Sequence, residues 1–200
     1  MPEIYLMMNK PAGYVCSAAS DSHKTVYELL PPELQDLVKN AKRGHRLHTI
    51  GRLDAETTGL LLLTTDGMFS HRIAAPVVPE LVEGPSKNHT ISKIYLVTLK
   101  FEVSPAQQTQ YITRAAQGLT LPPEKKAPEQ QAAPAQLKFI SQNQARITVT
   151  EGKFHEVRRI FLALENEVTE LKRIAIGSLF LPDSLKPGEY KSFSPEQILF

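Results

Sequence analysis

The segment GRLDAETTGLLLLTTDG, residues 51–67, concentrates side chains that could do acid–base or nucleophilic chemistry. It places Arg52, Asp54 and Glu56 directly before a run of four leucines, which predicts a strand buried on both faces and therefore central in a sheet. Charged groups at the mouth of such a strand are costly unless they are paired or used. A carboxylate here could act as a base or a nucleophile. Alternatively, Asp54 caps a turn and Arg52 pairs with Glu56.

The other reactive side chains form weaker patterns. Cys16 is the only cysteine, which excludes an internal disulfide and a multi-cysteine metal site, and a buried structural thiol is the simpler interpretation. The histidines lack the spacing of a zinc site. Ser70 and His71 are not surrounded by the GxSxG elbow of a hydrolase. The sequence contains no Walker loop and no dinucleotide fingerprint, and thus no pattern for a cofactor.

Cations are clustered in two parts of the chain, although the net charge is only +2. Clustered cations can supply the sequence-independent attraction to phosphate that RNA binding needs. A solvated loop is the alternative that charge alone leaves open. The first cluster contains Lys39, Lys42, Arg43, Arg46 and Arg52, and the second contains Lys153, Arg158, Arg159, Lys172 and Arg173.

The elements that must position these groups do not alternate as βαβ units. Proline and glycine turns separate several adjacent strands, which favours an α+β fold with a mixed, largely antiparallel sheet flanked by helices. We expect strands at residues 4–8, 60–65, 91–101, 137–140, 145–150 and 168–181, and helical segments at residues 26–30, 33–38, 66–74, 104–118, 154–164 and 194–197.

Two segments interrupt this pattern. Residues 77–88 (VVPELVEGPSKN) lack periodicity and are longer than most connections, so we expect an inserted surface loop. Residues 121–134 contain four prolines, charges and glutamines, which predicts a second surface loop. No apolar stretch approaches the roughly 18 to 20 residues that span a bilayer. The chain start has no basic segment before its apolar run, so we expect no signal peptide, no membrane partner and a cytoplasmic setting.

The segment at residues 51–67 resembles the catalytic motif of pseudouridine synthases that modify ribosomal RNA. Five further motifs of that family follow in the same order and rough spacing over essentially the whole chain, and together they are far more specific than one motif. The combination of GYVCS, DGxxSHRI, YLVTL and PGEY is most similar to the small-ribosomal-subunit branch. The further motifs are NKPAG at residues 9–13, SHRIAAP at 70–76, KIYLV at 93–97, EGKFHEVRRIF at 151–161 and LKRIAIGSLFL at 171–181.

This resemblance implies the pseudouridine synthase catalytic fold over residues 1–200, with two subdomains that share one sheet and a central RNA-binding cleft. Members of the branch usually begin with a small RNA-binding S4 domain. Because Met1 lies a few residues before the first expected strand, we expect that domain to be absent or removed. The segment at 77–88 is also foreign to the family pattern.

The resemblance further implies the reaction. A carboxylate attacks or deprotonates the ribose, the glycosidic bond breaks, the uracil rotates and C5 rejoins the sugar, so no cofactor is needed. By motif position, Asp54 is that carboxylate and Arg158 is its ion-pair partner, with Lys153 as the second candidate for the partner. Tyr95 matches the active-site tyrosine that stacks under the uracil, although an ordinary strand aromatic is the simpler interpretation of its position alone.

The expected substrate is structured RNA, either rRNA or a pre-ribosomal particle, bound by a monomer. The target base must be flipped out of the folded RNA, and nearby cations hold the strand open. A synthase acting on large-subunit rRNA or tRNA, and a non-catalytic RNA-binding or ribosome-assembly protein, are the alternatives. Expected substrate-binding residues are Arg52, Lys153, His155, Lys42, Arg43 and Arg46, with Ile174 or Ile176 as an apolar wall that could equally be plain core.

Overall fold

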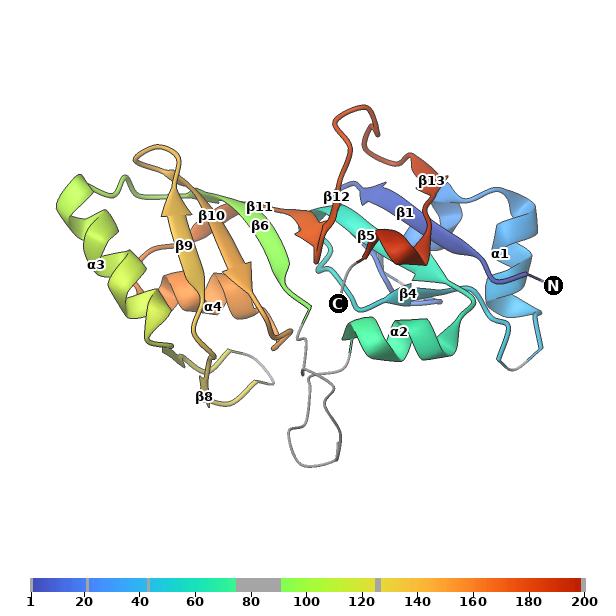
Figure 1. Cartoon of the computed structure of the whole chain (residues 1–200), viewed down its shortest axis with the longest axis horizontal. Helices are drawn as coiled ribbons and strands as arrows, with labels where there is room; N and C mark the ends of the chain where they lie inside the picture. Colours follow the sequence, from blue (N-terminus) through green and yellow to red (C-terminus); the bar gives the residue numbers. More distant parts are fainter. Residues whose placement is uncertain (1, 21, 43, 75–90, 125–126, 199–200) are drawn as a thin grey trace. The chain divides into compact units, whose positions relative to one another are not determined.

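The computed structural model describes residues 2–20, 22–42, 44–74, 91–124 and 127–198 (Figure 1). The chain divides into two compact units, one formed by Met1–Ala75 with Arg173–Leu199 and the other by Pro76–Lys172. Both units combine a sheet with helices, so the predicted α+β class is confirmed. Residues 77–88, for which an inserted loop was expected, lie outside the described residues.

The sheet of the first unit is built around β5 (Thr58–Thr64), the strand that the leucine run predicted. Leu60, Leu61, Leu62 and Leu63 are all fully buried, as expected for a central strand with both faces covered. Antiparallel β1 pairs Lys10 with Gly59 at the entrance to β5. In hydrogen-bonded order the strands are β13 (Tyr190–Ser192), β1 (Tyr5–Lys10), β5 and β11 (Val168–Ile176), with β4 (His48–Ile50) pairing β5 and β12 (Leu179–Phe180) pairing β11.

Short helices cover this unit, and their starts follow the sequence signals. Helix α2 begins after Asp66, whose Oδ1 accepts the Phe69 N–H at 2.9 Å. Ser194 and Gln197 form the predicted capping box, although it starts a single 3₁₀ turn. The remaining elements are β2 (Tyr14–Val15) and β3 (Lys24–Thr25), the 3₁₀ helix η1 (Val26–Leu29), α1 (Pro32–Lys39), α2 (Gly67–Ala74) and the 3₁₀ helix η3 (Pro195–Gln197).

The second unit packs two helices against one face of its own strands (Figure 1). Its core joins side chains of the strands, such as Val97 and Ile147, to Ile160 and Phe161 of the second helix. Residues 168–172 of β11 belong to this unit, so the unit boundary falls within that strand. In hydrogen-bonded order the strands are β11, β6 (Lys93–Leu99), β10 (Gln144–Val149) and β9 (Gln136–Phe139), and the helices are α3 (Pro105–Ala116) and α4 (Glu156–Ala163).

Residues 121–134, for which a surface loop or linker was predicted, contain short regular pieces in the part that the structure describes. Short strands β7 (Thr120–Leu121) and β8 (Gln130–Gln131) pair there. The Arg159 side chain, which is fully buried, donates to the carbonyls of Pro122 at 2.8 Å and Pro128 at 2.6 Å. A buried cation needs such acceptors, and they come from this segment, which is therefore drawn against α4.

The segment that leads into α4 contains a pair of glutamates with opposite pKa shifts. Burial, followed by the Glu151 carboxylate, raises the pKa of Glu156 to about 7. Burial also disfavours ionisation of Glu151, but bonds from Lys153 and from the Ala133 N–H outweigh it and lower the pKa of Glu151. The two carboxyl groups are hydrogen bonded, so below about pH 7 they share one proton where α4 begins.

The pair predicts a pH dependence of stability. A raised pKa means that the folded state favours protonated Glu156, so this stabilisation is present below pH 4.5 and is lost as pH rises through about 7. Glu156→Gln cannot ionise and should therefore gain stability relative to the parent chain, by about 2–3 kcal/mol, between pH 4.5 and 7.5. Urea unfolding of both proteins across this range measures the difference.

The matched control for this experiment is the exposed Glu129, changed to Gln, which should leave the pH profile of unfolding as it is in the parent chain. A Glu156→Gln protein whose stability runs parallel to that of the parent from pH 4.5 to 7.5 would contradict the shared proton.

Candidate active site

Asp54 lies in the first unit, half-buried, on the loop that leads from β4 into β5. Its carbonyl accepts the Thr57 N–H at 3.1 Å, which closes a turn around the carboxylate. The preceding Leu53 is buried and is bracketed by Cys16, whose Sγ accepts the Leu53 N–H at 3.4 Å and donates to the Leu53 carbonyl at 3.5 Å. Cys16 is thus a buried structural thiol, as the sequence predicted.

The loop is held in place by Lys10, the last residue of β1. The Lys10 side chain is fully buried. Its Nζ donates to the carbonyls of Pro11 at 3.1 Å, Ala55 at 2.9 Å and Thr57 at 2.8 Å. Burial lowers the pKa of Lys10, while the nearby Cys16, Asp54 and Glu56 act to raise it. Two of the three acceptors, Ala55 and Thr57, follow Asp54 within three residues. Lys10 therefore fixes the backbone of the loop that carries the Asp54 carboxylate.

Sequence reasoning missed Lys10 as a functional residue, although the NKPAG motif contains it. The available signal was its position, a lysine two residues after an apolar run and directly before a proline. A lysine at the end of a buried strand must either reach water or find several acceptors, and this one finds three.

Two cations of the predicted second cluster are structural and do not face solvent. Arg159 is fully buried and Arg173 is 2% exposed. Arg173 donates from Nε to the Leu60 carbonyl at 2.7 Å and so ties β11 to β5. Its Nη2 is buried and has no hydrogen-bond partner among the described residues. These two members of the second cluster are therefore not available to phosphate, because both side chains are buried.

The predicted residues of the second unit lie on β6 and α4. Tyr95 is half-buried on β6, opposite Ile147 of β10, and packs against the core of this unit. Arg158 is half-buried on α4 and donates from Nη1 to the Val168 carbonyl at 3.0 Å. Lys153, the second candidate for the ion-pair partner of Asp54, forms an ion pair with Glu151.

His155 and the two isoleucines have different surroundings from one another. His155 immediately precedes α4, with Nδ1 2.9 Å from Oε1 of Glu124. Ile174 is half-buried on β11, as a wall residue would be, whereas Ile176 is 1% exposed and belongs to the core. Of the two candidates for an apolar wall of the base pocket, only Ile174 therefore has a side chain that is partly accessible to a ligand.

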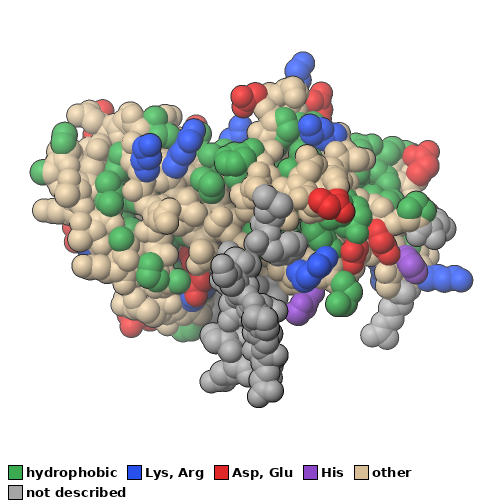
Figure 2. All heavy atoms as spheres, in the orientation of Figure 1, with side chains coloured by type: hydrophobic (Ala, Val, Ile, Leu, Met, Phe, Trp, Pro, Cys, Tyr) green, Lys and Arg blue, Asp and Glu red, His purple; other side chains and the backbone are tan. Residues whose placement is uncertain are grey.

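The first cationic cluster faces solvent. Lys42, Arg46 and Arg52 are exposed, and Arg46 also donates from Nε to the Ala41 carbonyl at 3.3 Å. Arg43 lies outside the described residues. On the face seen in Figure 2, Lys and Arg side chains are scattered among polar and apolar ones and do not form one continuous patch.

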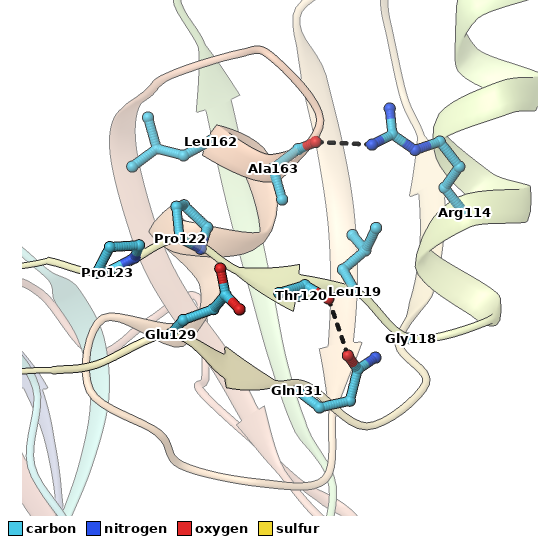
Figure 3. A pocket seen from close by; sticks show the side chains of 10 residues that line it. All are labelled: Arg114, Gly118, Leu119, Thr120, Pro122, Pro123, Glu129, Gln131, Leu162 and Ala163. Atoms are coloured by element: carbon cyan, nitrogen blue, oxygen red, sulfur yellow. Dashed lines mark hydrogen bonds between the residues drawn. The ribbon is translucent and has the colours of Figure 1, made fainter.

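One surface pocket, of about 490 Å³, lies in the second unit and contains none of the predicted site residues (Figure 3). Three of the polar side chains on its walls are hydrogen bonded, either to one another or to the backbone. Arg114 donates to the Ala163 carbonyl at 2.8 Å, and the Thr120 hydroxyl donates to Oε1 of Gln131 at 3.1 Å. This pocket is thus a seam between α3, α4 and the β7–β8 hairpin.

The described residues offer neither a metal site nor a membrane-spanning helix. No three His, Cys, Asp or Glu side chains gather where they could hold a metal ion in the part of the chain that is described. No helix in that part is long and apolar enough to cross a membrane.

Comparison of the sequence with known proteins points to one family. Residues 4–163 match the model of a family described as RNA pseudouridylate synthase. The chain is 39% identical over 194 residues to the ribosomal small subunit pseudouridine synthase A of Yersinia pestis, covering 97% of this chain and 71% of that protein. The same identity and length hold for the protein of that name from Escherichia coli strain K12, of which the chain covers 72%.

Solved structures agree. A crystal structure of a pseudouridylate synthase superimposes with a TM-score of 0.79 at 36% identity, covering 98% of this chain and 73% of that one. An H/ACA RNP bound to a substrate RNA superimposes with a TM-score of 0.56 at 14% identity, covering 92% and 50%, which shows a shared fold alone. The predicted fold and the resemblance of the six motifs are thereby confirmed: the chain belongs to the RNA pseudouridylate synthase family.

Proposed function

We propose that this protein isomerises a uridine of small-subunit ribosomal RNA to pseudouridine, with Asp54 as the catalytic carboxylate. The observation that carries the proposal is the position of Asp54 in the family's motif, at the entrance to a fully buried strand and on a loop held by Lys10. The names of the related proteins from Yersinia pestis and Escherichia coli support the choice of small-subunit rRNA.

The chemistry that this assigns to Asp54 requires an ionised carboxylate with a fixed direction. The reaction breaks the bond between ribose C1′ and uracil N1 and forms one between C1′ and C5. Asp54 acts on the ribose as nucleophile or base, C5 loses its hydrogen as a proton, and N1 gains one, so no electrons are exchanged. A neighbouring cation favours the ionised carboxylate, and we assign that role to Arg158.

The remaining groups would hold the RNA. We propose that Tyr95 stacks under the flipped uracil and that Ile174 covers its other side. Arg52, with Lys42, Arg43 and Arg46, would contact phosphates around the extruded nucleotide, whose extrusion costs a few kcal/mol. His155 and Lys153 would lie where the RNA passes α4. In the cell the substrate would be rRNA or a pre-ribosomal particle in the cytoplasm.

The first test is the release of the C5 hydrogen from tritiated RNA. Asp54→Asn keeps the shape of the side chain and removes its charge, so turnover should vanish while the Kd for RNA changes by less than about threefold. Small-subunit rRNA, large-subunit rRNA and tRNA are assayed side by side, and we expect release from the first.

The control for this test is Glu56→Gln, an exposed carboxylate two residues away that should stay active. Full activity of Asp54→Asn would end the assignment of Asp54. Binding of RNA by the parent chain without release from any of the three substrates would identify a non-catalytic RNA-binding or ribosome-assembly protein instead.

The pairing of Asp54 with Arg158 is tested by a double-mutant cycle. If the two form an ion pair, Arg158→Met leaves a carboxylate without its cation and should lower both turnover and stability. The double variant Asp54→Asn with Arg158→Met should then be more stable than the sum of the singles predicts, by about 1 kcal/mol or more. Urea unfolding of the four proteins measures this. Additive effects would place the two residues apart.

The first cationic cluster is tested through the salt dependence of RNA binding. Replacing Lys42, Arg43 and Arg46 by Ala should weaken binding and flatten the slope of log Kd against log salt by about 0.7–0.9 for each phosphate that is no longer neutralised. The single-turnover rate at saturating RNA should not change. A charge-matched triple variant of the exposed Lys138, Arg146 and Lys186 should bind as the parent does. An unchanged slope in the first triple would mean that the cluster is only a solvated surface.

A further inference from the structure

Two adjacent rings, Phe154 and His155, stack face to face where α4 begins. Their centroids are 3.8 Å apart and their planes differ by 15°. The ring pairs elsewhere in the described part of the chain are tilted or edge-on, with centroids at least 5.2 Å apart. Phe154 is nonetheless 42% exposed, so with His155 against one side the ring still presents surface to water.

The stack depends on an unfavourable backbone conformation. His155 has φ 49° and ψ 31°, the left-handed region, which costs a residue other than glycine about 1–3 kcal/mol. His155 is also the N-cap of α4, yet its side chain makes no capping hydrogen bond. Asp, Asn or Ser would cap the helix better, so helix formation does not account for a histidine in this conformation.

What holds His155 in place is Glu124, whose Oε1 lies 2.9 Å from Nδ1 of the ring. The backbone of Glu124 is itself fixed, because its N–H and carbonyl both bond to Ala127, at 3.0 and 2.8 Å. Oε2 of Glu124 is buried and has no hydrogen-bond partner in the part of the chain that the structure describes. The carboxylate of Glu124 thus holds the imidazole in place against the Phe154 ring.

We propose that Phe154 is a stacking platform for an unpaired base of the RNA substrate and that His155 is its rigid backing. The proposal rests on the proposed function, since it takes RNA as the ligand. Every base has a π-face, and proteins that bind single-stranded segments of RNA stack such bases on exposed aromatic rings.

The proposal predicts a rank order that only stacking produces. Filter binding to a small-subunit rRNA transcript should give Kd values for Phe154→Trp and Phe154→Tyr close to that of the parent chain. Phe154→Leu and Phe154→Ala should both bind about fivefold to a hundredfold more weakly, because Leu keeps apolar bulk but has no π-face. The slope of log Kd against log salt should not change, since no cation is removed.

Phe101→Ala is the matched control, because Phe101 is 52% exposed in the same unit and is not stacked on another ring. It should bind RNA as the parent does, and unfolding midpoints of all variants confirm that they fold. A Phe154→Leu protein that binds as tightly as the parent, or a Phe154→Ala protein that binds like Phe101→Ala, would overturn the platform. Binding is measured apart from tritium release, so a parent chain without turnover would contradict the proposed function and leave the Kd series to decide on Phe154.

Discussion

An ammonium group without access to water fixes the loop on which the proposed chemistry depends. Lys10 could not stay charged inside the first unit without acceptors, because burying a bare cation costs several kcal/mol. Three backbone carbonyls meet this need, two of them from the residues around Asp54. Arg159 and Arg173 are also buried and also donate to backbone carbonyls, although Nη2 of Arg173 has no hydrogen-bond partner among the described residues. These carbonyls carry no net charge, and the nearby carboxylates of Asp54 and Glu56 additionally favour the charged form of Lys10.

The neighbouring arginines of α4 show how one short sequence serves two purposes. Successive residues on a helix point about 100° apart, so Arg158 and Arg159 cannot share a direction. Arg159 is buried in the core and donates to carbonyls between β7 and β8, whereas Arg158 is half-buried and donates to the Val168 carbonyl. His155, one turn earlier, contacts Glu124 of the same segment. The bonds of the buried Arg159 therefore hold the β7–β8 segment against α4, the helix that carries Arg158 and follows the Phe154–His155 stack.

The features that could be predicted from the sequence are those determined by near neighbours in the chain. The leucine run specified β5, and Ser104 with Gln107 specified the start of α3 through a capping box. The burial of Arg159 and Arg173 could not be predicted, because their acceptors include carbonyls that lie 31 and 113 positions away in the chain. Site residues such as Tyr95 were identified by motif position, since nothing in their local pattern separates them from core residues.

The first unit is discontinuous in the chain, and this determines when it can be completed during synthesis. Asn9, one residue before Lys10, donates to the Leu185 carbonyl at 2.7 Å, and its own carbonyl accepts the Gly188 N–H at 2.8 Å. Strand β1 is thus flanked by a segment made more than 170 residues later. The first unit therefore closes around β1 only when the last segment of the chain has been made, and a chain that stops before Leu185 lacks both of these bonds.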